Sequence, residues 1–260
     1  MKVALVQLSA AADKKKNLQK AKNLCLRAIR NKAEFILLPE LFYYRGALKN
    51  FVSLAESIPG KSLSLFIALA KKHKVYILAG SVYEKIPGSK KVFNTSVLIN
   101  PQGKITAQYR KIHLFDAVIG RKKIKESGRF APGNKLITVN IKGYKAGLSV
   151  CYDLRFGEMY RQYAKKRVHI LCVPSAFTAK TGRAHWEILL RARAIENLCY
   201  VLAPNQIGQS EGGVVSYGSS MIIDPWGRIL ARASSNREEI IYARLDKKVL
   251  LEARRALPGI

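Results

Sequence analysis

The chain has 260 residues, 48% of them hydrophobic, so it can bury a substantial core and has the size of one large domain. Its apolar runs are shorter than the roughly 20 residues that cross a bilayer, and its first residues lack the apolar region of a secretion signal. Lys and Arg number 46 against 17 Asp and Glu, which gives a net charge of +29. The sequence predicts a single globular domain over residues 1–260 that does not enter a membrane.

The positive charge is spread in clusters along the chain, at residues 14–16, 71–74, 121–123 and 165–167. Such clusters bind polyanions through counterion release. The sequence has no interleaved aromatic residues, zinc fingers or helix-turn-helix pattern that indicates a specific nucleic-acid ligand. We therefore favour nonspecific adsorption over dedicated nucleic-acid binding, and we expect the cationic surface to attract an anionic substrate.

In chain order, short β-branched runs alternate with amphipathic helical stretches, which is the pattern of an α/β protein. Over the first part of the chain the pattern predicts strands at residues 2–8, 35–38 and 75–82, and helices at residues 18–30 and 63–73.

From residue 94 onward hairpins join the pattern. They are predicted over residues 95–109, 136–150 and 219–233, with helices at 157–167 and 184–197, strands at 169–173, 200–205 and 240–245, and a closing helix from Asp246. Mixed connections imply partly antiparallel sheets with helices on their outer faces, and two packed sheets account for the many apolar strands. The stretch at residues 112–134 has no clear element, and long loops of this kind are often functional.

The four cysteines are widely separated in the sequence: Cys25, Cys151, Cys172 and Cys199. They form no CxxC pair and have no histidine at a spacing typical of zinc sites. The sequence therefore predicts neither disulfides nor a metal site, and it fits a reducing cytoplasm.

Three reactive side chains, Glu40, Lys111 and Cys151, follow directly after predicted strands. Ends of strands are where α/β proteins place their sites. A thiol with its ordinary pKa of about 8.5 is mostly protonated at neutral pH, so a nucleophilic cysteine needs a neighbouring base or cation. Glu40 can accept the proton, and the positive charge of Lys111 can hold the charges of Glu40 and Cys151 in position.

Each of the three also has an ordinary structural explanation. Cys151 at a strand end can be small core filler. Glu40 can be a solvated loop carboxylate, and Lys111 is one lysine among many. Only the combination of the three contexts makes the interpretation specific.

The residues around these side chains resemble the three signatures of the carbon-nitrogen hydrolase, or nitrilase, superfamily. The matching stretches are residues 37–40 (Leu-Leu-Pro-Glu), 109–115 (Tyr-Arg-Lys-Ile-His-Leu-Phe) and 149–156 (Ser-Val-Cys-Tyr-Asp-Leu-Arg-Phe). The resemblance extends from residue 1 to about residue 257. It implies a four-layer αββα sandwich, a homodimer and no cofactor.

By the same resemblance, Cys151 attacks the amide carbon and forms a thioester, while Glu40 acts as general base and passes the proton to the leaving ammonia. Lys111 and the backbone N–H of Tyr152 would stabilise the oxyanion. Glu126 matches a second glutamate that orients the lysine and the substrate. The alternative for Glu126 is a solvated acid within a basic loop.

Within the superfamily the chain is most similar to the Nit-type ω-amidases, and among these to the deaminated-glutathione amidases. The similarity lies in residues 151–156, 174–178, 181–187, 216–218 and 224–227. True nitrilases typically carry Trp-Glu after the nucleophile, where this chain has Tyr-Asp. The resemblance therefore favours amide hydrolysis over nitrile hydrolysis.

Arg155 lies four residues beyond Cys151 and could clamp a substrate carboxylate with its fork of N–H donors. The alternative is an ion pair with Asp153 or Glu158. By resemblance, the further pocket candidates are Tyr43, Phe177, Thr178 and Trp186. Trp186 could equally be a core residue of its helix.

The sequence thus predicts an amidase of small carboxylate-bearing amides, of the deaminated glutathione or ω-amide type, that releases a carboxylate and ammonia. One alternative is an N-carbamoyl amino acid hydrolase, which would share Glu40, Lys111 and Cys151 and would also release carbon dioxide. The other alternative is a non-catalytic relative that binds a polyanion such as RNA. The intact set of three reactive residues argues against the second alternative.

Overall fold

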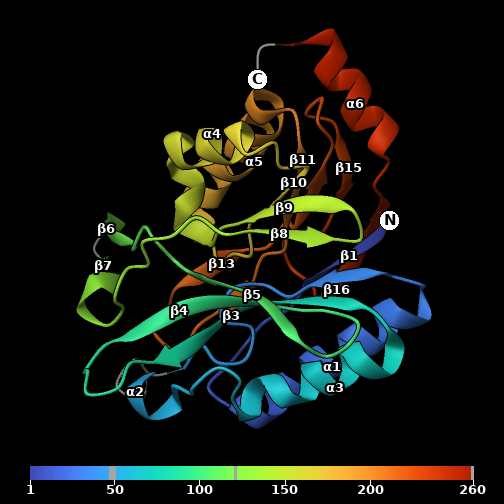
Figure 1. The fold of residues 1–260 in the computed structure, drawn as a ribbon. Coiled ribbons are helices and arrows are strands. Elements are labelled where there is room, and N and C mark those ends of the chain that lie inside the picture. The colour runs from blue at the N-terminus through green and yellow to red at the C-terminus, as the bar shows by residue number, and fades with distance from the viewer. Residues whose placement is uncertain (47–50, 120–121, 259–260) are drawn as a thin grey trace.

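The computed structural model describes residues 1–46, 51–119 and 122–258. Within these ranges the chain forms two six-stranded mixed sheets that pack against each other, with helices on their outer faces (Figure 1). The layers are helices, sheet, sheet and helices, which confirms the predicted αββα sandwich. Arg121, part of one of the basic clusters, lies outside the described residues.

The first sheet has parallel strands at its centre and antiparallel strands at its edges. Its strands lie in the order β16 (Glu239–Arg244), β1 (Lys2–Gln7), β2 (Phe35–Leu37), β3 (Tyr76–Lys85), β4 (Val92–Ile99) and β5 (Ile105–Arg110). Strands β1, β2 and β3 are parallel to one another, whereas β16, β4 and β5 pair antiparallel with their neighbours. The helices α1 (Lys14–Arg30) and α3 (Lys61–His73) cover its outer face, and the short α2 (Phe51–Leu54) contacts β3.

The second sheet repeats this arrangement. Its strands lie in the order β15 (Ile229–Arg232), β14 (Met221–Ile223), β11 (Tyr200–Ala203), β10 (Ile170–Cys172), β9 (Tyr144–Leu148) and β8 (Thr138–Ile141). Here β9, β10 and β11 are the parallel strands. The helices α4 (Gly157–Lys165) and α5 (Ala179–Asn197) cover the outer face, and α6 (Lys247–Ala256) lies at the end of the sandwich where the chain finishes (Figure 1).

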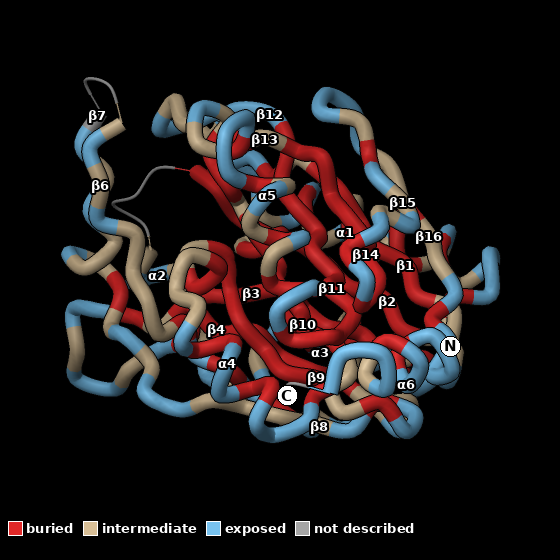
Figure 2. Tube along the Cα trace, turned by 90° about the horizontal axis from the view of Figure 1, so that it is seen from above, coloured by how far each residue is buried: buried red, intermediate tan, exposed pale blue. Residues whose placement is uncertain are grey.

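The central strands have runs of consecutive apolar residues because both of their faces are buried. In β1, Val3 and Leu5 belong to the core between the sheets, whereas Ala4 and Val6 belong to the core under α1 and α3. Successive side chains of a strand point to opposite faces, so a strand between two cores needs apolar residues at every position. Figure 2 shows the same contrast, with buried central strands and more exposed outer segments such as β6 (Asp116–Ile119).

Three helices begin earlier than the sequence predicted: α3 at Lys61 rather than at residue 63, and α1 and α5 by a full turn. Helix α1 begins at Lys14 because the Asp13 side chain accepts a hydrogen bond from the Lys16 backbone N–H at 3.0 Å, which caps the helix. Helix α5 begins at Ala179, five residues before the predicted start. Gly182 weakens the helical pattern there, but a Cβ atom at this position would lie 2.4 Å from the Tyr217 ring, so the glycine permits close packing.

The stretch at residues 112–134 is more regular than predicted. It contains a hairpin of β6 and β7 (Lys122–Lys125), followed by the 3-10 turn η2 (Glu126–Gly128). A second short pair, β12 (Ile207–Gln209) and β13 (Val215–Tyr217), was also missed. These strands are short and partly exposed, so they lack the apolar alternation on which the prediction depended. None of the helices in the described ranges has the length and apolar character needed to traverse a bilayer.

Gly80 in β3 packs against the backbone that leads to Glu40. A Cβ atom at Gly80 would lie 2.0 Å from the Leu38 carbonyl oxygen and 2.3 Å from that of Pro39. We predict that Gly80→Ala lowers the free energy of unfolding by about 2 kcal/mol or more, because backbone atoms cannot move aside as a flexible side chain can. Urea unfolding of both proteins measures the difference.

Gly212→Ala is the matched control, since the nearest atom to a Cβ there is Ser210 Oγ at 3.9 Å. Its free energy of unfolding should stay within about 0.5 kcal/mol of the wild-type value. Coincident unfolding curves for Gly80→Ala and the wild-type protein would contradict the packing argument.

Candidate active site

Three strand ends bring Glu40, Lys111 and Cys151 to one region. Glu40 comes shortly after β2, Lys111 follows β5 directly, and Cys151 begins the 3-10 turn η3 (Cys151–Arg155) after β9. Because β2 and β5 belong to the first sheet and β9 to the second, the region lies where the two sheets meet. The exposed fractions of the three residues are 3%, 1% and 8%, so all are withdrawn from bulk water.

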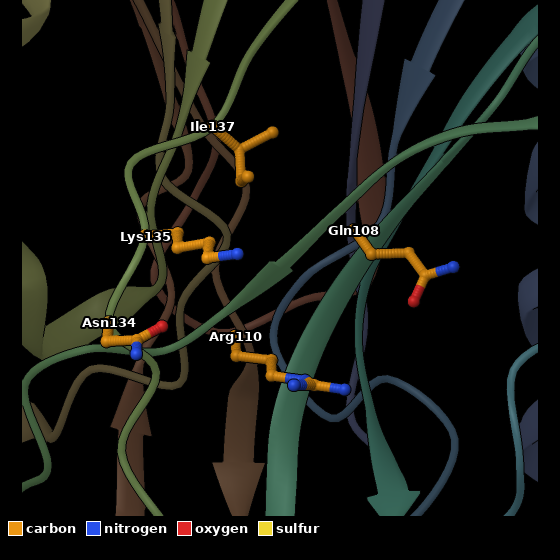
Figure 3. A pocket seen from close by; sticks show the side chains of 5 residues that line it. All are labelled: Gln108, Arg110, Asn134, Lys135 and Ile137. Carbon is orange, nitrogen blue, oxygen red and sulfur yellow. The ribbon is translucent and has the colours of Figure 1, made fainter.

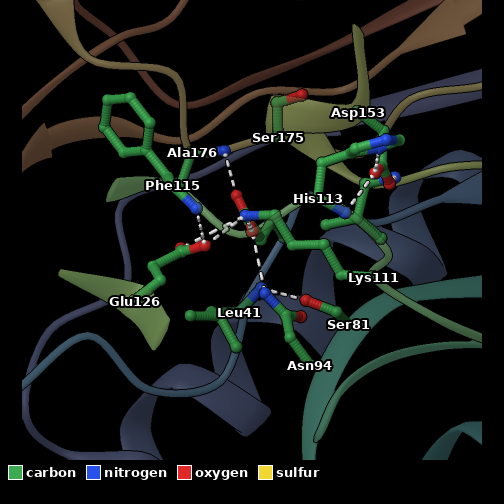
Figure 4. A network of polar contacts seen from close by, with 12 residues as sticks. Leu41, Ser81, Asn94, Lys111, His113, Phe115, Glu126, Asp153, Ser175 and Ala176 are labelled. Carbon is green, nitrogen blue, oxygen red and sulfur yellow. Dashed lines mark hydrogen bonds and ion pairs between the residues drawn. The ribbon is translucent and has the colours of Figure 1, made fainter. Parts of the chain in front are cut away.

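Both carboxylate oxygens of Glu40 accept hydrogen bonds. Oε1 accepts from Lys111 Nζ at 3.0 Å and from Asn94 Nδ2 at 2.9 Å, and Oε2 accepts from the Ala176 backbone N–H at 2.9 Å (Figure 4). The Gln206 side chain donates to the Glu40 carbonyl at 2.9 Å. Charge-assisted bonds of this kind fix the orientation of the carboxylate.

The ammonium group of Lys111 lies between two carboxylates. Its Nζ is 3.0 Å from Glu40 Oε1 and 3.1 and 2.9 Å from Oε1 and Oε2 of Glu126 (Figure 4). Burial acts to lower the pKa of Lys111, but the charges of Glu126 and Glu40 outweigh it and raise that pKa well above its usual value. Lys111 therefore stays charged at neutral pH.

Glu126 is held in place rather than solvated. Its side chain is 14% exposed, and its Oε2 also accepts the Phe115 backbone N–H at 2.7 Å. Burial raises the pKa of Glu126, and the neighbouring charge of Lys111 opposes that shift. The alternative of a solvated loop acid does not fit this environment.

Cys151 leaves its strand in a conformation that few residues adopt. Its φ of 50° lies in the left-handed region, and its backbone N–H donates to the Pro174 carbonyl at 3.0 Å. Burial raises the pKa of the thiol well above the usual value, and the negative charge of Glu40 adds to the shift, whereas Lys111 opposes it. A thiol in this state is neutral at rest and needs a base such as Glu40 before it can act as a nucleophile.

Asp153 is a buried carboxylate that the sequence analysis did not identify as part of the site. It accepts hydrogen bonds from the Tyr109 hydroxyl at 2.7 Å, from the Val150 backbone N–H at 2.8 Å and from the His113 backbone N–H at 2.9 Å. The His113 Nδ1 lies 2.8 Å from the same carboxylate, and the His113 ring stacks on Phe156 at 3.6 Å. Asp153 therefore joins the turn that carries Cys151 to the segment that carries Lys111.

The sequence analysis also missed Asn94, which donates to Glu40 from the neighbouring part of β4. Asn94 is 1% exposed, and its Oδ1 is buried without a hydrogen-bond partner. An asparagine inside a strand gives no sequence signal of such a contact. Asp153, in contrast, lies within the signature at residues 149–156, so a search of the signature for acids could have found it.

A narrow pocket opens beside the thiol. Cys151, Tyr152, Arg155, Phe177 and Thr178 line it, and all five were predicted as site residues. Their side chains come from η3 and from the segment just before α5. The structure thus brings most of the predicted pocket together around Cys151.

Two predicted pocket residues lie elsewhere. Tyr43 is 1% exposed, and its hydroxyl accepts the Tyr83 backbone N–H at 3.0 Å, so it packs in the core under α1 and α3. Trp186 is fully buried, and its indole N–H donates to the Ser219 carbonyl at 2.8 Å. Its ring packs behind Phe177 at 5.0 Å, which supports the cavity wall without lining the cavity.

Arg155 lies across the aromatic wall of the cavity. Its guanidinium is 5.7 Å from the centre of the Tyr152 ring and 5.2 Å from that of Phe177, within the range of cation–π attraction. Both terminal nitrogens lie 3.3 Å from His185 Nδ1. The alternative for Arg155 was an ion pair with Asp153 or Glu158, and the described residues show neither pair. The Asp153 carboxylate accepts hydrogen bonds from other donors.

A larger hollow of about 820 Å³ lies on the outside, along β5 (Figure 3). Gln108, Arg110, Asn134, Lys135 and Ile137 line it. Arg110 makes two hydrogen bonds to Glu84, at 2.8 and 2.5 Å, and its guanidinium lies against the Phe93 ring. The charge of Arg110 is therefore compensated, and this hollow holds none of the predicted site residues.

Within the described ranges, no group of three or more His, Cys, Asp and Glu side chains is arranged to hold a metal ion. Cys25, Cys172 and Cys199 are buried free thiols whose pKa values are raised by burial.

Residues 2–255 match the family model described as carbon-nitrogen hydrolase. The mouse protein Omega-amidase NIT2 is 37% identical over 258 residues, which cover 99% of this chain and 92% of that protein. The NitFhit protein of C. elegans is 38% identical with a TM-score of 0.93, and the match covers 99% of this chain but 63% of that longer protein.

A variant of the amidase from Nesterenkonia sp. AN1, with acrylamide added to its active-site cysteine, is 25% identical with a TM-score of 0.83, over 99% of this chain and 98% of that one. The fold, the match over nearly the whole chain and the relatives named as amidases agree with one another. This chain therefore belongs to the carbon-nitrogen hydrolase family and is an amidase of the nitrilase superfamily, similar to the Nit-type ω-amidases.

Proposed function

We propose that this amidase hydrolyses a small amide that carries a carboxylate, of the deaminated glutathione or ω-amide type, and releases a carboxylate and ammonia through a thioester. The observation that carries the proposal is the buried Lys111 ammonium between Glu40 and Glu126, beside the cavity that contains Cys151. The similarity to Omega-amidase NIT2 of mouse supports the substrate class.

In the first half of the reaction Cys151 is the nucleophile. Its Sγ bonds to the amide carbon as the thiol proton moves to Glu40, whose carboxylate is already oriented by Asn94 and Lys111. The carbonyl oxygen becomes an oxyanion, which Lys111 and the backbone N–H of Tyr152 stabilise. The C–N bond then breaks, and the leaving nitrogen takes the proton from Glu40 and departs as ammonia.

In the second half of the reaction, after ammonia has left, water hydrolyses the thioester. Glu40 takes a proton from the water, the hydroxyl oxygen bonds to the thioester carbon, and the C–S bond breaks. The sulfur of Cys151 takes up the proton from Glu40, which restores the resting thiol. Lys111 keeps its charge throughout, because the two carboxylates hold its pKa high.

Arg155 supplies the contact with the substrate carboxylate in this proposal. It lines the cavity four residues beyond Cys151, and its planar fork of donors suits a carboxylate. Its resting place over the rings of Tyr152 and Phe177 lets it turn toward a bound anion without breaking an ion pair.

We also propose a single hydrolase domain over residues 1–260, which is supported by the first sheet, because it combines β1–β5 with β16 from the other side of the second sheet in the chain, and by the family match over residues 2–255. Assembly as a homodimer and a cytoplasmic location stay predictions from the sequence.

The first test is ammonia release from deaminated glutathione, α-ketoglutaramate, a simple nitrile and an N-carbamoyl amino acid. We expect turnover of the first two, and a loss of about 10³-fold or more in Cys151→Ala because the nucleophile is removed. Cys172→Ala is the matched control, since this buried thiol lies in β10 away from the cavity.

Carbon dioxide released together with ammonia from the carbamoyl compound would instead identify the N-carbamoyl amino acid hydrolase. If none of the compounds releases ammonia, and circular dichroism confirms that the protein is folded, the polyanion-binding alternative would be favoured.

The raised pKa of the Cys151 thiol predicts a pH dependence. Because the thiolate is the reactive form, alkylation by iodoacetamide should accelerate as the pH rises through neutrality and should still be rising at the ordinary thiol pKa of about 8.5. In Glu126→Gln the rise should begin at lower pH, because one of the negative charges that raise the pKa of Cys151 is gone.

Peptide mass spectrometry identifies the alkylated cysteine, and Cys151→Ala gives the background rate. A rate that is constant from about pH 6 to about pH 9 would mean that the thiolate is already present at rest, and it would contradict this assignment.

The role of Arg155 has its own test. Arg155→Ala should raise KM for acidic amides by about tenfold or more, the size expected for a lost hydrogen bond to a charged group, with a much smaller change for neutral amides. Arg183→Ala is the matched control because Arg183 is an exposed arginine of α5. If KM rises equally for acidic and neutral amides in Arg155→Ala, Arg155 has only a structural role.

A further inference from the structure

Arg45 is a buried cation in the loop that follows Glu40. The residue is 9% exposed, and its Nη1 is buried without a hydrogen-bond partner among residues 1–46, 51–119 and 122–258. Buried polar groups in folded proteins are nearly always paired, and an unpaired charged donor is costly. A donor left open in this way is therefore a candidate for contact with a ligand.

Glu40, the carboxylate that acts most strongly on Arg45, belongs to the active site. Burial lowers the pKa of Arg45, and the nearby Glu40 carboxylate acts in the opposite direction. Glu40 does not need Arg45 as a donor, because both of its oxygens already accept hydrogen bonds from Lys111, Asn94 and Ala176. Arg45 lies in the loop that follows Glu40, and no group in the described ranges forms a hydrogen bond with its Nη1.

The backbone around Arg45 is fixed on both sides. The Arg45 N–H donates to the Ala11 carbonyl at 3.0 Å, and its carbonyl accepts the Glu211 N–H at 3.3 Å. A Cβ atom on Gly46 would meet the Tyr44 hydroxyl oxygen at 2.5 Å. These contacts fix the backbone that carries the arginine before any ligand arrives, which lowers the entropic cost of binding.

We propose that Arg45 binds the carboxylate of the substrate inside the site and thereby selects acidic amides. The proposal rests on the proposed function and deepens it. Arg45 is a buried cation that acts in addition to Arg155, which forms the more exposed side of the pocket. A bound carboxylate supplies the missing partner of Nη1. A neutral amide leaves that donor unpaired, so the discrimination against neutral amides arises largely from the unpaired charge.

The test compares α-ketoglutaramate with hexanamide, an amide without a carboxylate, in wild type, Arg45→Gln, Arg45→Lys and Arg155→Gln. We expect Arg45→Gln to raise KM for α-ketoglutaramate by about 30-fold or more, as for the loss of one partner of a buried charge pair. The kcat and the kcat/KM for hexanamide should change by less than about threefold, since neither depends on a carboxylate contact. Arg45→Lys keeps the charge without the planar fork and should give an intermediate KM.

Stability separates this role from a structural one. Without ligand, Arg45→Gln should unfold at the same urea concentration as wild type or a higher one, because it removes a buried charge that lacks a partner. A lower midpoint together with equal losses on both amides would overturn the proposal. So would a normal KM for α-ketoglutaramate in Arg45→Gln combined with a raised one in Arg155→Gln.

Binding without turnover distinguishes failure of this proposal from failure of the proposed function. Calorimetry with glutarate measures carboxylate binding to Cys151→Ala and to Cys151→Ala combined with Arg45→Gln or Arg45→Lys. We expect binding that weakens by about 30-fold or more in the Gln variant, even if the wild-type enzyme releases no ammonia from any amide tested. Equal glutarate affinity in all three proteins would overturn the role of Arg45 whatever the substrate proves to be.

Discussion

The candidate site depends on the buried ammonium group of Lys111, which lies within 3.1 Å of carboxylate oxygens from both Glu40 and Glu126. Taking such charges out of water is costly, and removal of one partner leaves the others uncompensated. The position of each group therefore constrains the other two. Glu40 and Lys111 follow strands of the first sheet, whereas Cys151 follows a strand of the second. The site therefore exists only while the two sheets keep their relative position.

A second buried carboxylate maintains that relation. Asp153 accepts the Tyr109 hydroxyl from β5 and the His113 backbone N–H from the segment after Lys111, and it also accepts the N–H of Val150 next to Cys151. The distance between nucleophile and ammonium is thus set by hydrogen bonds at the strand ends rather than by long loops. Catalytic geometry of this kind needs no rearrangement when charge develops on the substrate, which is the condition for electrostatic stabilisation.

The strands and the reactive residues could be predicted from the sequence because their signals are local. Apolar runs mark buried strands, and Glu40, Lys111 and Cys151 each follow one. The supporting contacts are not local: Asp153 lies 44 positions from Tyr109 and Asn94 lies 54 positions from Glu40. No periodicity reveals such pairs, so the sequence alone could not identify them. The same limit explains Tyr43, since only the backbone path decides which side chains of its loop face the core and which face the site.

The charges of the site account for the resting thiol and underlie the proposed preference for an anion. Glu40 and Glu126 both pair with the single ammonium group of Lys111, so a thiolate on Cys151 would add a further negative charge beside two carboxylates. Burial then favours the neutral thiol until substrate and base are in place. The surplus of +29 on the whole chain attracts anions in general, but salt screens it beyond about 10 Å. Selection among anions therefore falls to cations inside the site, where the dielectric is low and each unpaired donor carries a cost.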